Sequence, residues 1–128
     1  MFLMETKGWT HWLIFYDEST IYGWNVVRNK LFTLLNATDI VSIAVDSHRG
    51  FLFLADDISV TKYGFVVDLG KDKMHPSISI INGSSLTVFK DSEITSIAVD
   101  SDNSVLYIAS LLGITTIMYN KGKYGTLP

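Results

Sequence analysis

The stretch Ser42-Ile-Ala-Val-Asp-Ser47 occurs again, residue for residue, at Ser96-Ile-Ala-Val-Asp-Ser101, 54 positions further along the chain. The likeness extends without a gap over Leu31–Asp56 and Ser85–Ser110, where most unequal pairs are chemically similar. An internal period of this size is typical of a repeat architecture, in which each copy is one supersecondary unit. The repeat therefore predicts the shape of the fold, and it specifies no reaction.

The composition predicts a single folded domain. The chain has 128 residues, of which 48% are hydrophobic and 18% charged, and this is too apolar for a disordered chain. The formal charge of -3, without a basic cluster, argues against a nucleic-acid partner. No apolar run approaches the ~18 residues of a membrane helix, so we expect no membrane partner. The absence of cysteine excludes disulfides and cysteine-based zinc sites.

The first residues have no basic segment followed by a long apolar core, and therefore do not form a signal peptide as they stand. Asn36-Ala-Thr38 and Asn82-Gly-Ser84 match the N-glycosylation sequon, which favours secretion. We expect an extracellular location if a longer parent chain carries a signal peptide.

Short β-branched and aromatic runs, separated by turn residues, predict strands along the whole chain. Each copy of the repeat contains a hairpin of two such runs, followed by a third strand and preceded by the fourth strand of the unit before it. The expected strands include Leu31–Leu35, Ile40–Val45, Phe51–Ala55, Ser59–Val67, Leu86–Phe89, Ile94–Val99, Val105–Ala109 and Ile114–Tyr119. One unit is thus four short strands, a to d.

The segment before the first full copy fits the same unit without its first strand, because His11–Asp17 resembles Gly50–Asp56. The middle unit contains extra residues, with Ser77–Ile81 as an additional short strand. The sequence therefore divides into residues 1–37 (strands b–d), 38–92 (a full unit with an insertion near 71–83) and 93–128 (strands a–c).

Four-stranded antiparallel units that repeat at roughly 40–50 residues are typical of β-propeller blades. Each small sheet has two apolar faces, and only neighbouring blades cover both. A β-sandwich, the alternative, has no reason to repeat Ile-Ala-Val-Asp-Ser at matching places. We expect an all-β fold of antiparallel four-stranded propeller blades, with about two and a half blades of an incomplete propeller, since closed propellers have about 4–8.

The strand Ile97–Asp100, a turn and the strand Leu106–Ala109 resemble blades of the six-bladed TolB-like propellers, which include NHL, YWTD and gluconolactonase-like blades. The resemblance covers about Thr10–Tyr119, although the Tyr-Trp-Thr-Asp and Asn-His-Arg signatures of two of these groups are missing. The long, cysteine-free, irregular blades look most like the insect ommochrome-binding proteins. That likeness implies a non-enzymatic binding propeller whose ligand is a small aromatic molecule or pigment.

Three tryptophans are candidate ligand contacts. Trp9, Trp12 and Trp24 lie in the aromatic-rich N-terminal unit, where they form either a stacking surface for a planar ligand or the filling of an interface between blades. Asp46 and Asp100 end the first strand of their units, and turn formation explains them better than catalysis. We find no catalytic constellation and expect no cofactor.

Acidic residues in the loops at one end of the units are candidate metal ligands. Asp39, Asp56 and Glu93 would suit a hard cation, although solvated loop acids are the alternative. The histidines share no metal-ligand spacing.

The sequence thus predicts a non-enzymatic binding module for a small aromatic molecule, a pigment or a protein. The alternatives are a metal-dependent hydrolase of the lactonase type and a truncated chain without independent function. Open blade edges also predict self-association.

Overall fold

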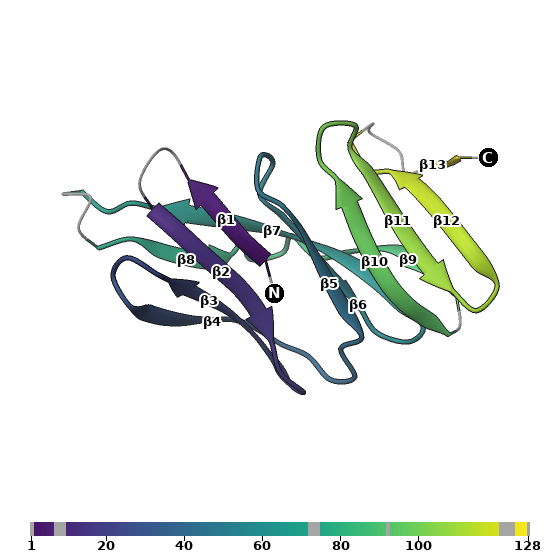
Figure 1. The fold of residues 1–128 in the computed structure, drawn as a ribbon, viewed down its shortest axis with the longest axis horizontal. Helices are drawn as coiled ribbons and strands as arrows, with labels where there is room; N and C mark the ends of the chain where they lie inside the picture. Colours follow the sequence, from purple (N-terminus) through teal and green to yellow (C-terminus); the bar gives the residue numbers. More distant parts are fainter. Residues whose placement is uncertain (1, 7–9, 72–74, 92, 121–124, 128) are drawn as a thin grey trace.

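The computed structural model of the chain describes residues 2–6, 10–71, 75–91, 93–120 and 125–127. These residues form three antiparallel sheets and no helix, so the expected all-β class is confirmed. The sheets follow one another along the longest axis of the molecule (Figure 1). They do not close into a ring within the described residues.

Each sheet is built mainly from consecutive strands joined by tight turns. The first contains β1 (Phe2–Thr6), β2 (Thr10–Tyr16), β3 (Thr20–Asn25) and β4 (Lys30–Asn36). The middle sheet contains β5 (Ser42–Asp46), β6 (Phe51–Ala55), β7 (Ser59–Asp68), β8 (Ser77–Ile80) and β9 (Leu86–Lys90). The third contains β10 (Ile94–Asp100), β11 (Val105–Ser110), β12 (Gly113–Met118) and β13 (Gly125–Leu127).

The strand counts expected for the two outer units are wrong. β1 pairs with β2 and completes the first sheet, and β13 pairs with β12 and completes the third. β1 does not resemble the repeated first strand, and β13 is only three residues long. Both strands depend on pairing with a neighbour, which local sequence patterns do not report.

The insertion in the middle unit extends the middle sheet over the first. The additional strand expected near Ser77–Ile81 is confirmed as β8, which pairs with the second half of β7, while β9 pairs with the first half. Ile78 of β8 is buried, and its Cγ2 lies 2.8 Å from where a Cβ on Gly23 would stand. Only glycine at position 23 therefore allows β8 to pack this closely.

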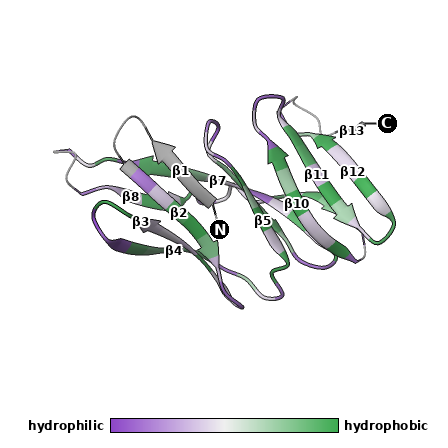
Figure 2. Ribbon diagram, in the orientation of Figure 1, coloured by the Kyte–Doolittle hydropathy of each residue, from purple (hydrophilic) through white to green (hydrophobic). Residues whose placement is uncertain are grey.

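Hydrophobic residues recur along the strands (Figure 2), and their side chains form two buried clusters that hold the three sheets together. The cluster between the first and middle sheets includes Trp12, Ile14, Ile21, Leu34, Ile43, Leu52, Leu54, Phe65 and Ile78. The cluster between the middle and third sheets includes Ala44, Phe53, Ala55, Val60, Ile94, Ile97, Leu106, Ile108, Ile117 and Tyr119. The middle sheet thus contributes buried side chains from both of its faces.

Candidate functional site

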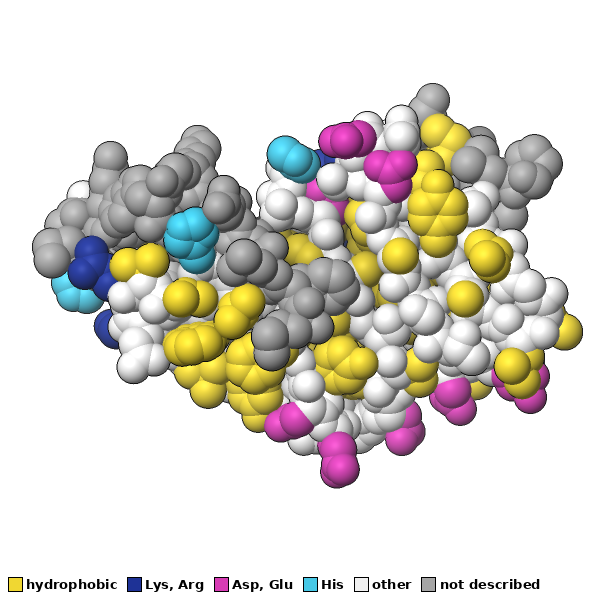
Figure 3. Space-filling model, viewed as in Figure 1, with side chains coloured by type: hydrophobic (Ala, Val, Ile, Leu, Met, Phe, Trp, Pro, Cys, Tyr) yellow, Lys and Arg dark blue, Asp and Glu magenta, His cyan; other side chains and the backbone are white. Residues whose placement is uncertain are grey.

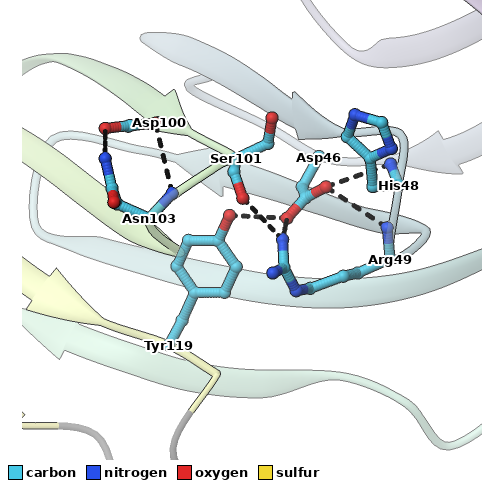
Figure 4. A network of polar contacts seen from close by, with 7 residues as sticks. All are labelled: Asp46, His48, Arg49, Asp100, Ser101, Asn103 and Tyr119. Carbon is cyan, nitrogen blue, oxygen red and sulfur yellow. Dashed lines mark hydrogen bonds and ion pairs between the residues drawn. The ribbon is translucent and has the colours of Figure 1, made fainter.

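The aspartate of each repeated hexapeptide closes the turn between the first two strands of its sheet. The Oδ1 of Asp46 accepts hydrogen bonds from the backbone N–H groups of His48, at 3.1 Å, and Arg49, at 3.2 Å. The Oδ1 of Asp100 accepts one from the backbone N–H of Asn103, at 3.3 Å. The prediction that both residues form turns is therefore confirmed (Figure 4).

Asp46 also takes part in a polar network that joins the middle and third sheets (Figure 4). Its Oδ2 accepts a hydrogen bond from the Tyr119 hydroxyl at 2.6 Å and another from Arg49 Nη1 at 2.9 Å. The same Arg49 nitrogen donates to the backbone carbonyl of Ser101 at 2.7 Å. Asp46 is fully buried, so this carboxylate is paired away from water.

The network sets the protonation of its members. Burial alone would raise the pKa of Asp46, but hydrogen bonds from Tyr119 and Arg49 outweigh it and hold the pKa below its ordinary value. Burial, and then the hydrogen bond to Asp46, raises the pKa of the Tyr119 phenol. At neutral pH the carboxylate is charged and the phenol neutral. The described partners of the carboxylate all donate hydrogen bonds to it, and the arrangement joins two sheets.

No sequence pattern indicates this network, because the two hexapeptides are identical and only one of their aspartates is buried. Tyr119, which supplies the hydroxyl, lies 73 positions beyond Asp46. Its equivalent in the middle sheet is Phe65, since both residues come directly after the same ladder positions, and Phe65 has no hydroxyl.

The predicted metal-ligand candidates lie in loops at one end of the sheets, where Figure 3 shows acidic side chains along the lower rim. The carboxylate of Asp56 accepts hydrogen bonds from Ile58 and Ser59 and closes a turn. Asp39 and Glu93 both have positive φ angles, of 58° and 63°, and are exposed. No three acidic or histidine side chains among the described residues gather into a cation site.

The tryptophan candidates have different positions. Trp12 is fully buried between the first and middle sheets, and its Nε1 has no hydrogen-bond partner in the described part of the chain. Trp24 is half-buried, and its Nε1 donates to Asn29 at 3.2 Å. Trp9 lies outside the described residues. The structure does not bring Trp12 and Trp24 onto a common accessible surface, because they lie on adjacent strands with side chains on opposite faces.

The two sequon asparagines are exposed, Asn36 at the end of β4 and Asn82 in the β8–β9 connection. A shallow surface depression is lined by Ser19, Asn36, Ala37 and Thr38.

Among the described residues, no sheet covers one face of the third sheet at the end of the molecule. We define the third-sheet face by residues whose side chains share the side of β10–β12 away from the middle sheet: Ser96, Ala98, Tyr107, Ala109, Ile114 and Thr116. In the ladder register Tyr107 corresponds to Phe53, and Ile114 corresponds to Val60. Phe53 and Val60 are 0% exposed, whereas Tyr107 is 40% and Ile114 74% exposed.

A second uncovered face lies on the opposite side of the molecule. We define the first-sheet face by Leu13, Phe15, Tyr22, Trp24, Val26 and Leu31, which share the side of β2–β4 away from the buried cluster. The Phe15 and Tyr22 rings stack at 5.2 Å between centroids. Leu31 is 59% exposed and Val26 41%. None of the residues that define either face is charged.

A scan against protein-family models found no match, and neither did a search of curated proteins. Among the described residues, no helix is long and apolar enough to span a membrane.

Proposed function

We propose that the chain is a non-enzymatic binding module made of successive blades of the β-propeller type, and that it binds a protein through the third-sheet face. The observation that supports this proposal is the contrast between matching positions of two sheets. The side chains of Ala44, Phe53 and Val60 are fully buried by the next sheet, while Ala98, Tyr107 and Ile114 are exposed.

The third-sheet face has the chemistry of a surface that another sheet covers. Small residues alternate with larger apolar ones, as in the middle sheet, where Ala44 lies opposite Phe53. In the third sheet, Ala98 lies opposite Tyr107. Covering a side chain such as Ile114 completely contributes about 1.5–3 kcal/mol. Large apolar side chains that are exposed on one sheet face, as Tyr107 and Ile114 are, favour a protein–protein contact.

The distribution of side chains over this surface supports the same proposal. Figure 3 shows hydrophobic side chains at the surface over β11 and β12, and acidic ones at the rim. An apolar centre with a polar rim is the usual anatomy of a protein interface.

A small aromatic ligand is a second candidate, and one observation favours it. Phe15 and Tyr22 stack on the first-sheet face, with Trp24 on the neighbouring ladder position of the same face. A planar pigment of the ommochrome type would stack on these half-buried rings. Quenching of Trp24 fluorescence by a xanthommatin-like chromophore, lost in Tyr22→Ala, supports this candidate; unchanged fluorescence removes it.

Photo-cross-linking in the cells that make the protein tests the leading proposal. Benzoylphenylalanine replaces Tyr107, and a control chain carries it in place of Val66, which is 49% exposed on the middle sheet. We expect a discrete cross-linked product from position 107 that disappears when Ile114→Lys is added. The absence of any product at 107, or the same products from both positions, contradicts the proposal.

A further inference from the structure

We propose that the occupant of the third-sheet face is the first-sheet face of a second copy of this chain, in a head-to-tail contact. This inference rests on the function proposed above, since it names the partner of the same surface. The chain's own internal contacts are the precedent for it.

Inside the chain, the same two faces of a sheet meet at both junctions, although the strands in closest contact differ: β4 and β8 at the first, β5 and β10 at the second. In the first and middle sheets, the face equivalent to the third-sheet face is covered by the next sheet along the chain. The next sheet makes this contact with its other face, the one equivalent to the first-sheet face. At the first contact, Ile14 and Ile21 are covered by residues that include Leu52. At the second, Phe53 and Val60 are covered by residues that include Leu106. The same pair of faces therefore meets at both junctions, and β8 adds to the first one only.

The first-sheet face carries the covering positions of this contact. Leu13 has the ladder position of Leu52 and Leu106, and these two leucines are 0% exposed because each covers the preceding sheet. Leu13 is only half-buried, since no sheet precedes it among the described residues.

The residue after the third strand repeats the same pattern. Val26, Phe65 and Tyr119 each donate a backbone N–H to a carbonyl at or next to the start of the second strand of their sheet, so they occupy one structural position. Phe65 and Tyr119 are buried against the preceding sheet, and Val26 is 41% exposed. Two faces are therefore left without a neighbouring sheet among the described residues. The first-sheet face has the positions that cover a preceding sheet, and the third-sheet face has the positions that a following sheet covers.

The two faces are complementary in size. The third-sheet face has small residues on β10, Ser96 and Ala98, next to the ring of Tyr107. The first-sheet face offers large rings, Trp24 and Tyr22, whose polar tips are already hydrogen-bonded to Asn29 and Asp17 within the same sheet. Because these two polar tips already have partners, burial of the Trp24 and Tyr22 rings would leave neither donor unsatisfied.

A contact between two different faces is heterologous, and it forms a closed ring when the rotation between subunits allows it and an open array when it does not. The described residues of each chain form three sheets, so those of two chains joined at both ends form six. Six lies within the range of about 4–8 sheets at which propellers close. We therefore expect a ring-like dimer.

Complementation by two single variants tests the inference. Ile114→Lys places a charge on the third-sheet face, and Leu31→Lys places one on the first-sheet face. Ile81→Lys is the matched control, because Ile81 is 48% exposed in the β8–β9 connection and lies on neither face. Circular dichroism and thermal melting establish that each variant folds, and Tyr107→Lys replaces Ile114→Lys if that variant does not.

Sedimentation velocity is then measured over a range of concentrations. We expect the unmodified chain and Ile81→Lys to sediment as dimers at high concentration, and Ile114→Lys and Leu31→Lys each to be monomeric. An equal mixture of these two variants should recover dimers, because each retains the face that the other has lost.

A monomeric unmodified chain overturns the inference, as does a mixture that stays monomeric. A dimer of Leu31→Lys alone also overturns it, because the third-sheet face would then bind a copy of itself. If position 107 cross-links to a different protein while the chain is monomeric, the inference fails and the proposed function stands. If position 107 gives no product and the chain is monomeric, both fail.

Discussion

Ser42–Ser47 and Ser96–Ser101 are identical in sequence, and in both an aspartate closes the turn that comes after the strand. Around the first copy, the carboxylate of Asp46 is buried and bonded to Tyr119 of the third sheet. Around the second, Asp100 is half-buried, and its Oδ2 accepts a hydrogen bond from the Asn103 side chain within the turn. The local conformation is therefore a property of the hexapeptide, whereas the burial depends on whether a neighbouring sheet covers it.

The largest difference in stability should be found between alanine substitutions of Phe53 and Tyr107, which occupy the same ladder position in the two copies. Phe53→Ala removes a ring that is 0% exposed and leaves a cavity, and we expect it to cost about 3–5 kcal/mol of unfolding free energy. Tyr107→Ala should cost less than about 1 kcal/mol in the monomer. Urea denaturation of both variants at low protein concentration measures the difference, and equal costs would contradict the difference in burial.

Asp46→Asn should be the next largest change. Asparagine keeps the turn but leaves Arg49 without its carboxylate, and we expect a loss of about 2 kcal/mol, against less than about 0.5 kcal/mol for Asp100→Asn. Because the folded-state pKa of Asp46 is lowered, its contribution is complete above the ordinary value of 3.8 and is lost as pH falls through the folded-state pKa. Unfolding free energies from pH 7 downward should therefore converge for the unmodified chain and Asp46→Asn. A gap that persists in strong acid would rule out the carboxylate as its cause.

Tyr119→Phe tests the same junction from the third sheet. The ring still packs against Phe53, at 4.9 Å between centroids, so only the hydrogen bond to Asp46 is lost, and we expect a cost of about 1–2 kcal/mol. The raised pKa means that the neutral phenol contributes fully below its ordinary value of 10.0 and that this contribution is lost as pH rises through the folded-state pKa. Thermal melting at neutral and alkaline pH measures it. A cost for Tyr119→Phe that does not shrink above pH 10 would disprove the bond's role.

The smallest effect concerns the turns themselves. Gly50 and Ser104 occupy the same place in the two copies, and their φ angles are 71° and 56°. Serine is strained in this left-handed region, so Ser104→Gly should stabilise the chain by up to about 1 kcal/mol. Differential scanning calorimetry resolves a change of this size, and a lower melting temperature would show that the Ser104 side chain contributes more than its backbone costs.

Much of the fold can be predicted from the sequence. The repeated hexapeptide predicts both hairpins, and turn residues such as Asp56 predict where strands end. β1 and β13 could not be predicted, because their pairing depends on neighbours and not on their own pattern. The different environments of Asp46 and Asp100 could not be predicted either. The two residues have the same local sequence, and their burial differs because a neighbouring sheet covers only the first. Trp12 fills the interface between the first and middle sheets, which is one of the two roles that the sequence allowed for it.

Among the described residues, a neighbouring sheet covers the first copy of the repeat and not the second. The solvent accessibility of positions 44 and 98 tests this difference. These alanines share one position in the repeat, and the chain has no cysteine, so Ala44→Cys and Ala98→Cys each provide a single thiol. Labelling by a maleimide is measured in the folded protein at several concentrations, with a denatured sample as the reference. We predict that the thiol at 44 stays protected at every concentration, while the thiol at 98 reacts rapidly in dilute protein and becomes protected as the chain associates. Equal reactivity of the two thiols, or reactivity at 98 that does not change with concentration, would contradict this prediction.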